Sequence, residues 1–161
     1  TPAGPIAVMN LIGQVFMHSN NRCPFEAADQ IISQIPDSVK VRICDFHGEA
    51  TSEKQGMGWH LAERASLVYG THSHVPTMDH RIFSQHTGFV TDIGMSGAYE
   101  SVIGMKVNLA LKKLRGKEKV TFQPAKGDPR LSFVVADIDQ LTGVCKSLQK
   151  FLWGPDILEK L

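Results

Sequence analysis

Segments typical of strands and of helices alternate along the first half of the chain, and this alternation restricts the fold most strongly. Residues 39–44 alternate apolar and polar side chains with a period of two, and residues 66–69 form a second apolar run, so both are predicted to be strands. A further strand is expected at 6–11. Apolar residues recur at spacings of three and four in 25–35 and again in 52–65, which predicts two helices. This order of elements predicts an α/β fold.

The second half of the chain favours shorter, antiparallel strands. Strand candidates at 81–83 and 88–91 flank a polar turn, and a helix is expected at 101–114. Residues 120–122 and 131–136 are predicted to pair with each other, because the Gly-Asp-Pro sequence between them is typical of a turn. Together with the first half, these segments predict a mixed sheet with helices packed on it.

The composition indicates one globular domain. A chain of 161 residues can bury most of its apolar surface in one core, so residues 1–161 are treated as a single domain. The 17 Lys and Arg residues balance 16 Asp and Glu residues, which gives no argument for a nucleic-acid groove or a membrane surface. The three cysteines lack C-x-x-C spacing, and no apolar run is long enough to span a membrane. We therefore expect free thiols and a cytoplasmic location.

The first residues suggest that something precedes them. The chain opens at Thr1 without an initiator Met and soon reaches the strand expected at 6–11. We interpret this as an entry from an upstream segment, for which processing, trimming and a split protein are alternative origins. If 6–11 is an interior strand of a larger sheet, its edge would lack a partner, and we would expect the isolated chain to form a homo-oligomer or to aggregate.

Three histidines lie just past the ends of predicted strands. His47 follows the strand at 39–44, and His72 and His74 follow the strand at 66–69. Ligands of open α/β sheets collect at the carboxyl ends of strands. Side chains two residues apart in an extended loop project to the same side, with Cα atoms about 6.5 Å apart, so this pair could hold one metal ion or two neighbouring ions. Without His47, ordinary surface histidines would be the simpler interpretation.

The sequence around these histidines resembles the YmdB-like family of calcineurin-type metallophosphoesterases. The resemblance covers residues 6 to about 146, whereas the tail at 151–161 has no match in it. The motifs that carry the resemblance are DFHGEATSEK at 45–54, GTHSHV at 70–75, TDIGMSG at 91–97 and FQPAKGDPRL at 122–131.

The resemblance implies a four-layered α/β/β/α metallophosphoesterase sandwich around a dinuclear metal centre. Two divalent transition metals (Fe, Mn or Zn) would orient a phosphodiester such as a 2′,3′-cyclic nucleotide, activate water and stabilise the charge that develops during hydrolysis. Carried over to this sequence, His47 and His72 share one ion and His74 holds the other.

The family's remaining ligands have no counterpart here. In the family, the N-terminal half supplies an Asp, a bridging Glu, two Asn ligands and the His expected to act as general acid, and none of these precedes Thr1. Three neutral imidazoles offset none of the charge of two divalent ions, so this chain alone is expected to be inactive. We interpret it as the C-terminal portion of a metallophosphoesterase domain, with the N-terminal half as its partner. The alternative is a non-catalytic module, either an assembly domain or a scaffold for one Zn, Fe, Mn or Ni ion.

Two carboxylates are candidates to support the ligands. Asp45 could orient a ligand imidazole, because metal-binding histidines usually donate their second N–H to a carboxylate or a carbonyl. Asp92 follows the strand at 88–91 toward the same edge and is assigned a similar supporting role. The alternative for Asp45 is simple capping of the strand end.

Polar residues at the start of the helix expected at 52–65 have a simpler interpretation. Glu49 lies near the proposed site, but such residues are normal at a helix N-terminus and are interpreted as capping. Ser52 and Gln55 resemble a capping box.

Overall fold

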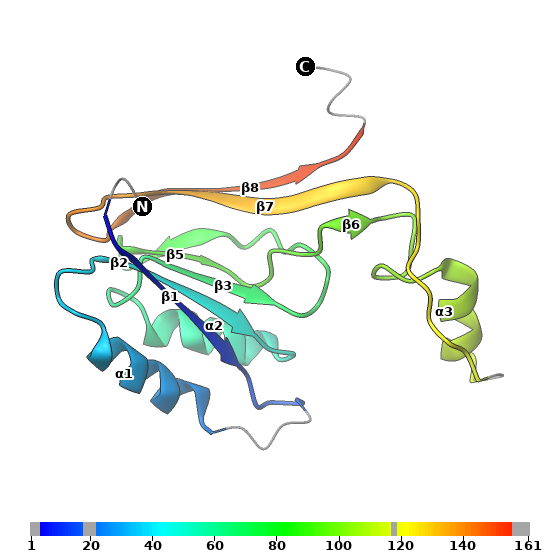
Figure 1. The fold of residues 1–161 in the computed structure, drawn as a ribbon, viewed down its shortest axis with the longest axis horizontal. Coiled ribbons are helices and arrows are strands. Elements are labelled where there is room, and N and C mark those ends of the chain that lie inside the picture. The colour runs from blue at the N-terminus through cyan, green and yellow to red at the C-terminus, as the bar shows by residue number, and fades with distance from the viewer. Residues whose placement is uncertain (1–3, 18–21, 117–118, 156–161) are drawn as a thin grey trace.

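The chain folds into three layers in the computed structural model, which describes residues 4–17, 22–116 and 119–155. Two helices cover one face of a five-stranded sheet, and a smaller sheet lies over the opposite face (Figure 1). The fold class is therefore mixed α/β, as predicted, and the described residues supply three layers of the α/β/β/α order. Among these residues, no helix has the length and apolar character that a membrane span requires.

The larger sheet is mixed. Its strand order is β1-β2-β3-β5-β4, and only the β4–β5 pair is antiparallel. The strands are β1 (Ile6–Ile12), β2 (Val41–His47), β3 (Leu67–Thr71), β4 (Arg81–Phe83) and β5 (Thr87–Val90). Because β1, β2 and β3 are parallel neighbours, their carboxyl ends lie at the same edge of the sheet.

The two helices of the outer layer begin and end for local reasons. In α1 (Pro24–Gln34), Pro24 occupies the first turn, where its missing N–H is not needed. Ile35 follows the helix with ψ of 124°, because the next residue, Pro36, disfavours a helical conformation before it. The second helix, α2 (Thr51–His60), has Ala50 at its N-cap and no side-chain cap.

The core lies between the helices and the larger sheet. In β1, Met9 and Leu11 are buried toward the helices, whereas Val8 on the other face is 67% exposed. Burying a large apolar side chain contributes roughly 1.5–3 kcal/mol, so this layer carries much of the stability. The buried cluster consists of Met9, Leu11, Ala28, Cys44, Phe46, Met57, Leu61, Ala65, Val68, Phe83 and Phe89.

The smaller sheet is antiparallel. It contains β6 (Gly97–Ala98), β7 (Pro129–Ile138) and β8 (Cys145–Trp153), with β7 in the middle. The β8 strand packs against β4 and β5, which joins the two sheets. Of the tail at 151–161, the first three residues belong to β8, and 156–161 lie outside the described residues.

The second half of the chain differs most from the prediction. The helix α3 (Val107–Leu114) is shorter than expected, because Ile103 has φ of 44° and cannot belong to a right-handed helix. The expected pairing of 120–122 with 131–136 is wrong. β7 pairs with β8 in a ladder from Leu131 opposite Trp153 to Ile138 opposite Cys145, and this long ladder outweighs a three-residue partner.

Boundaries of helices and strands in the first half of the chain also differ from the predicted ones. The strand expected at 39–44 runs from Val41 to His47, so His47 is the last residue of the strand and not part of a following loop. The α2 helix ends at His60, before the expected end at 65, and Glu63 with φ of 65° lies in the turn that follows. The proposed capping box is wrong, because no side chain caps this helix.

Candidate metal centre

Two strand ends bring the candidate histidines together. His47 ends β2, and His72 follows Thr71, which ends β3. The two strands are parallel neighbours, and their register places His47 opposite Thr71. The geometry therefore places the histidines at the carboxyl edge of the sheet, where ligands of open α/β sheets collect.

The rings of His47 and His72 are in direct contact. The Nδ1 atom of His72 lies 3.1 Å from the Nε2 atom of His47. The ring centroids are 4.9 Å apart and the rings are nearly perpendicular, at 77°. Both side chains are partly buried. The two nitrogens therefore converge on a common point.

A hydroxyl and a carboxylate fix the orientation of the His47 ring. Its Nδ1 atom lies 3.0 Å from Thr71 Oγ1, and the Thr71 hydroxyl lies 3.3 Å from Asp45 Oδ1. An ionised carboxylate only accepts hydrogen bonds, so the Thr71 hydroxyl donates to Asp45 and accepts from the His47 Nδ1–H. The Nε2 atom of a neutral His47 then presents a lone pair to His72. Asp45 thus acts on His47 through Thr71, and the Asn10 amide in turn donates to Asp45 at 2.8 Å.

Glu49 fixes His72 in the complementary way. Its Oε2 atom lies 2.6 Å from His72 Nε2, which must therefore carry the proton. The Nδ1 atom of a neutral His72 then presents its lone pair to His47. The interpretation of Glu49 as a helix cap missed this contact, although its place two residues after His47 was the available signal.

The resulting arrangement fits a cation between the two rings. Two lone pairs that face each other repel unless a proton or a metal ion lies between them. Two nitrogen ligands of one tetrahedral zinc ion, each at about 2.0–2.1 Å, would be roughly 3.3 Å apart, close to the 3.1 Å between His47 and His72. Imidazole suits Zn, Fe, Ni and Cu. Within 4–17, 22–116 and 119–155, however, no three His, Cys, Asp or Glu side chains form a group that could hold an ion.

His74 lies apart from this pair. Its Nδ1 atom is 2.9 Å from the backbone oxygen of Ile103, to which it donates a hydrogen bond. The expectation of an extended loop is wrong, because His72 has φ of 119° and His74 has φ of 64°. Ile103 is also left-handed, which is uncommon for a β-branched residue. The structure therefore brings together two of the three predicted ligands.

Asp92 supports the loop between the two histidines and does not touch a ring. Its Oδ2 atom accepts hydrogen bonds from the Ser73 N–H at 2.9 Å and from Lys54 Nζ at 2.8 Å, and its Oδ1 atom accepts from the Gly94 N–H at 2.8 Å. Burial alone would raise the pKa of Asp92, but these hydrogen bonds outweigh it and lower the pKa. The carboxylate is therefore ionised and fully engaged.

Glu53 anchors a second loop at the same edge. This buried carboxylate accepts hydrogen bonds from the N–H groups of Gln14 at 2.9 Å and Val15 at 3.2 Å, just after β1. Gly13 leaves room for this contact, because a Cβ at that position would lie 2.4 Å from Glu53 Oε2 and displace the carboxylate. This role could have been inferred from the sequence. Glu53 and Lys54 lie at helical spacing before Met57 and Leu61, so these charged residues share the apolar, buried face of α2.

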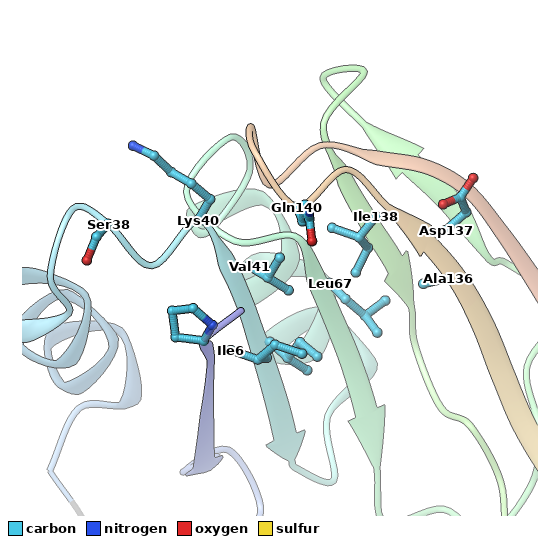
Figure 2. A pocket seen from close by; sticks show the side chains of 11 residues that line it. Ile6, Ser38, Lys40, Val41, Leu67, Ala136, Asp137, Ile138 and Gln140 are labelled. Carbon is cyan, nitrogen blue, oxygen red and sulfur yellow. The ribbon is translucent and has the colours of Figure 1, made fainter. Parts of the chain in front are cut away.

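A separate cavity lies at the opposite edge of the sheet. It has a volume of about 500 Å³ and opens between the amino ends of β1, β2 and β3 and the end of β7 (Figure 2). Its lining is mainly aliphatic, with Lys40 and Asp137 among its polar residues. The seven residues of β2 span roughly 20 Å, so this cavity is separate from the histidine pair. A smaller cavity of about 230 Å³ adjoins His74 and is lined by Met95, Tyr99 and Ile103 among others.

The sequence matches a known family over nearly its whole length. The family model described as YmdB-like protein matches residues 2–151. A 2′,3′-cyclic-nucleotide 2′-phosphodiesterase of Bacillus subtilis is 39% identical over 151 residues, which cover 94% of this chain and 57% of that protein. A putative phosphatase/phosphodiesterase of Mycoplasma pneumoniae is 29% identical over 83% of this chain and 48% of its own length. The chain thus spans about half the length of these relatives.

Solved structures show the same fold. A hypothetical protein from Thermus thermophilus superposes with a TM-score of 0.84 at 31% identity, over 91% of this chain and 56% of that one. A structure described as a novel phosphatase from Mycoplasma pneumoniae superposes with a TM-score of 0.83 at 26% identity, over 94% of this chain and 55% of that one.

Proposed function

The chain belongs to the YmdB-like family, and on this premise we propose that it serves the metal-dependent hydrolysis of phosphodiesters such as 2′,3′-cyclic nucleotides. The name of the Bacillus subtilis relative supports the substrate class. The observation that carries the proposal in this chain is the pair of ring nitrogens of His47 and His72 that converge at 3.1 Å.

In the proposed centre, His47 and His72 hold one divalent ion through the two facing nitrogens. Thr71 and Glu49 keep the outer nitrogens of these rings protonated, so that the inner ones remain available as ligands. His74 is proposed as a ligand of a second ion through its Nε2 atom, while its Nδ1–H donates to the Ile103 carbonyl.

The ions would supply charge stabilisation for the phosphoryl group and activation of the attacking water. The chain's own residues would bind these ions and orient the metal-binding rings. None of the histidines acts as acid or base in this proposal, since each ring nitrogen is either a ligand or engaged with Thr71, Glu49 or Ile103. The oxygen ligands and the general acid are proposed to come from the part of the relatives that this chain does not cover.

A complementation assay tests this function. The chain alone, with added Mn²⁺ or Fe²⁺, should hydrolyse bis-p-nitrophenyl phosphate and 2′,3′-cyclic AMP near background. Adding the part of the Bacillus subtilis relative that the chain does not match should raise hydrolysis of 2′,3′-cyclic AMP, and His72→Ala should abolish the gain. Equal hydrolysis by the complemented His72→Ala variant and by the complemented unsubstituted chain would contradict the proposal.

A metal-binding scaffold without catalysis is the second candidate. This candidate is favoured because only two candidate ligands, His47 and His72, come together in the described residues. Among those residues, no third carboxylate or histidine completes an ion site. Metal bound at the histidine pair, together with background hydrolysis in every complementation mixture, would support this second candidate.

A further inference from the structure

Lys54 and Asp92 form a buried ion pair that contacts the loop carrying His72 and His74. The Nζ and Oδ2 atoms are 2.8 Å apart, and the side chains are only 3% and 2% exposed. A buried ion pair is weak evidence for stability, because well-packed apolar residues often replace such pairs without loss. Its place in the structure suggests a role in geometry.

The loop that this pair contacts has a strained backbone. His72 and His74 both have positive φ, at 119° and 64°, in a region that side chains disfavour. Such a conformation persists only when surrounding contacts hold it. Two hydrogen bonds do so here: the Ser73 N–H donates to Asp92 Oδ2 at 2.9 Å, and the Met95 N–H donates to the His74 carbonyl at 3.1 Å.

Lys54 fixes the carboxylate that holds the loop. Its ammonium and the Ser73 N–H share the Oδ2 atom of Asp92, while the Gly94 N–H occupies Oδ1. The aliphatic part of Lys54 packs against β3, where a Cβ on Gly70 would lie 2.8 Å from its Cδ. The lysine side chain thus lies between α2 and β3.

We propose that the Lys54–Asp92 ion pair is a positioning element that sets the directions in which His72 and His74 present their ring nitrogens. The pair links α2 to the amide between the two histidines, so it holds the backbone of the loop from which both rings project. That these nitrogens bind a metal ion rests on the proposed function. The control of their orientation does not depend on it.

The test compares two lysine variants of the metal-free chain. Lys54→Met removes the buried pair, whereas Lys146→Met removes a lysine–aspartate pair of the same 2.8 Å separation between β7 and β8. Long-range ¹H–¹⁵N spectra would report the imidazole nitrogens, and Co²⁺ absorption would report metal affinity. With Lys54→Met we expect shifted His72 and His74 signals, faster exchange of the Ser73 amide and Co²⁺ affinity reduced about 10- to 100-fold. Lys146→Met should leave all three unchanged.

Two further measurements keep the proposal testable if Lys54→Met does not fold. The double variant Lys54→Met with Asp92→Asn removes both charges of the pair and should show the same changes. In the unsubstituted chain, the Ser73 amide should be protected from hydrogen exchange. An unprotected Ser73 amide, or a folded variant with unchanged histidine signals, would overturn the proposal. If the unsubstituted chain binds no Co²⁺ while the signals still move, the proposed function fails and the positioning role stands.

Discussion

The Nε2 atom of His47 and the Nδ1 atom of His72 lie 3.1 Å apart, although 25 positions separate the two residues in the chain. The register of β2 on β3 creates this contact, because it places His47 opposite Thr71, the residue before His72. Successive side chains of a strand point to opposite faces, so a shift of one residue would turn His47 toward the helices. The pair therefore depends on the sheet as a whole.

Removal of either ring should weaken metal binding. His47→Ala or His72→Ala is expected to reduce Zn²⁺ affinity by roughly 100-fold or more. Each removes a proposed ligand, and loss of a residue that only orients a metal-binding histidine already costs about 10- to 100-fold in affinity. The triple alanine variant that includes His74 should reduce bound metal to the level of a blank in elemental analysis. His60→Ala serves as the control, since His60 pairs with Asp29 between the helices. Unchanged metal content in the triple variant would refute the site.

Loss of the residues that orient these rings should have a smaller effect. Thr71→Val removes the acceptor of the His47 Nδ1–H, and Glu49→Gln removes the charge that holds the proton on His72. Each is expected to lower Zn²⁺ affinity about 10-fold or somewhat more, with the thermal unfolding midpoint nearly unchanged. Calorimetric titration measures the affinity, and Glu26→Gln in the first turn of α1 is the matched control. Equal affinities for Glu49→Gln and Glu26→Gln would count against the role of Glu49.

Gly70→Ala should destabilise the fold strongly. A Cβ at this position would lie 1.8 Å from the carbonyl oxygen of Thr91 and 2.8 Å from Lys54 Cδ, and a backbone atom cannot move aside cheaply. We expect a loss of about 3 kcal/mol or more in the free energy of unfolding, measured by urea denaturation. Gly97→Ala is the control, because a Cβ there meets nothing within 4 Å and should change stability by less than about 1 kcal/mol. Similar midpoints for both variants would contradict this packing.

Asp139 should titrate at unusually low pH. A hydrogen bond from Lys146, and then the N–H groups of Leu141 and Thr142, lower the pKa of Asp139 from 3.8 to about 2. Since the folded pKa lies below the unfolded one, the contribution of this group to stability is present above about pH 4 and is lost as the pH falls to about 2. Side-chain NMR titration should show this midpoint, and Lys146→Met should raise it. A midpoint near 3.8 in the unsubstituted chain would disprove the contact.

The chain is expected to self-associate through β1. In the described residues β1 pairs only with β2, and Ile6, Val8 and Ile12 on its face away from the helices are 43%, 67% and 43% exposed. An unpaired edge with apolar side chains favours pairing with a second copy of the chain. Sedimentation should show a concentration-dependent dimer that Val8→Lys weakens.

The control for this prediction is Leu141→Lys. Leu141 is 77% exposed and lies in the turn between β7 and β8, a strand pair that does not include β1. The Leu141→Lys variant should leave the dimer unchanged. A chain that stays monomeric at all concentrations would show that β1 is not an association edge.

The sequence predicted the first half of the fold because its signals there were local and strong. The period-two pattern before Asp45, and the apolar spacing that ends at Pro36, each specify one element without help from distant residues. The β7–β8 pairing was missed for the opposite reason. Which strand Leu131 to Ile138 pairs with depends on ladder length and on packing against β4 and β5, and neither quantity can be read from a local pattern.

The candidate site was predictable in its position but not in its contacts. Strand ends indicated that His47 and His72 would meet at one edge, and they do. The positive φ of His74 depends on hydrogen bonds with residues about 20 positions away, so spacing alone suggested an extended loop that does not exist. Glu49 and Lys54 were missed because a charged residue at a helix start normally has a simpler explanation.

The parallel arrangement of β1, β2 and β3 also has a kinetic consequence. Each pair joins segments that are 24 or more residues apart, so a long crossover must close before any ladder hydrogen bond can form. His47 and His72 come together only when β2 and β3 are in register, so we expect their contact to form late in folding. An ion bound there would therefore slow the unfolding rate and leave the folding rate nearly unchanged.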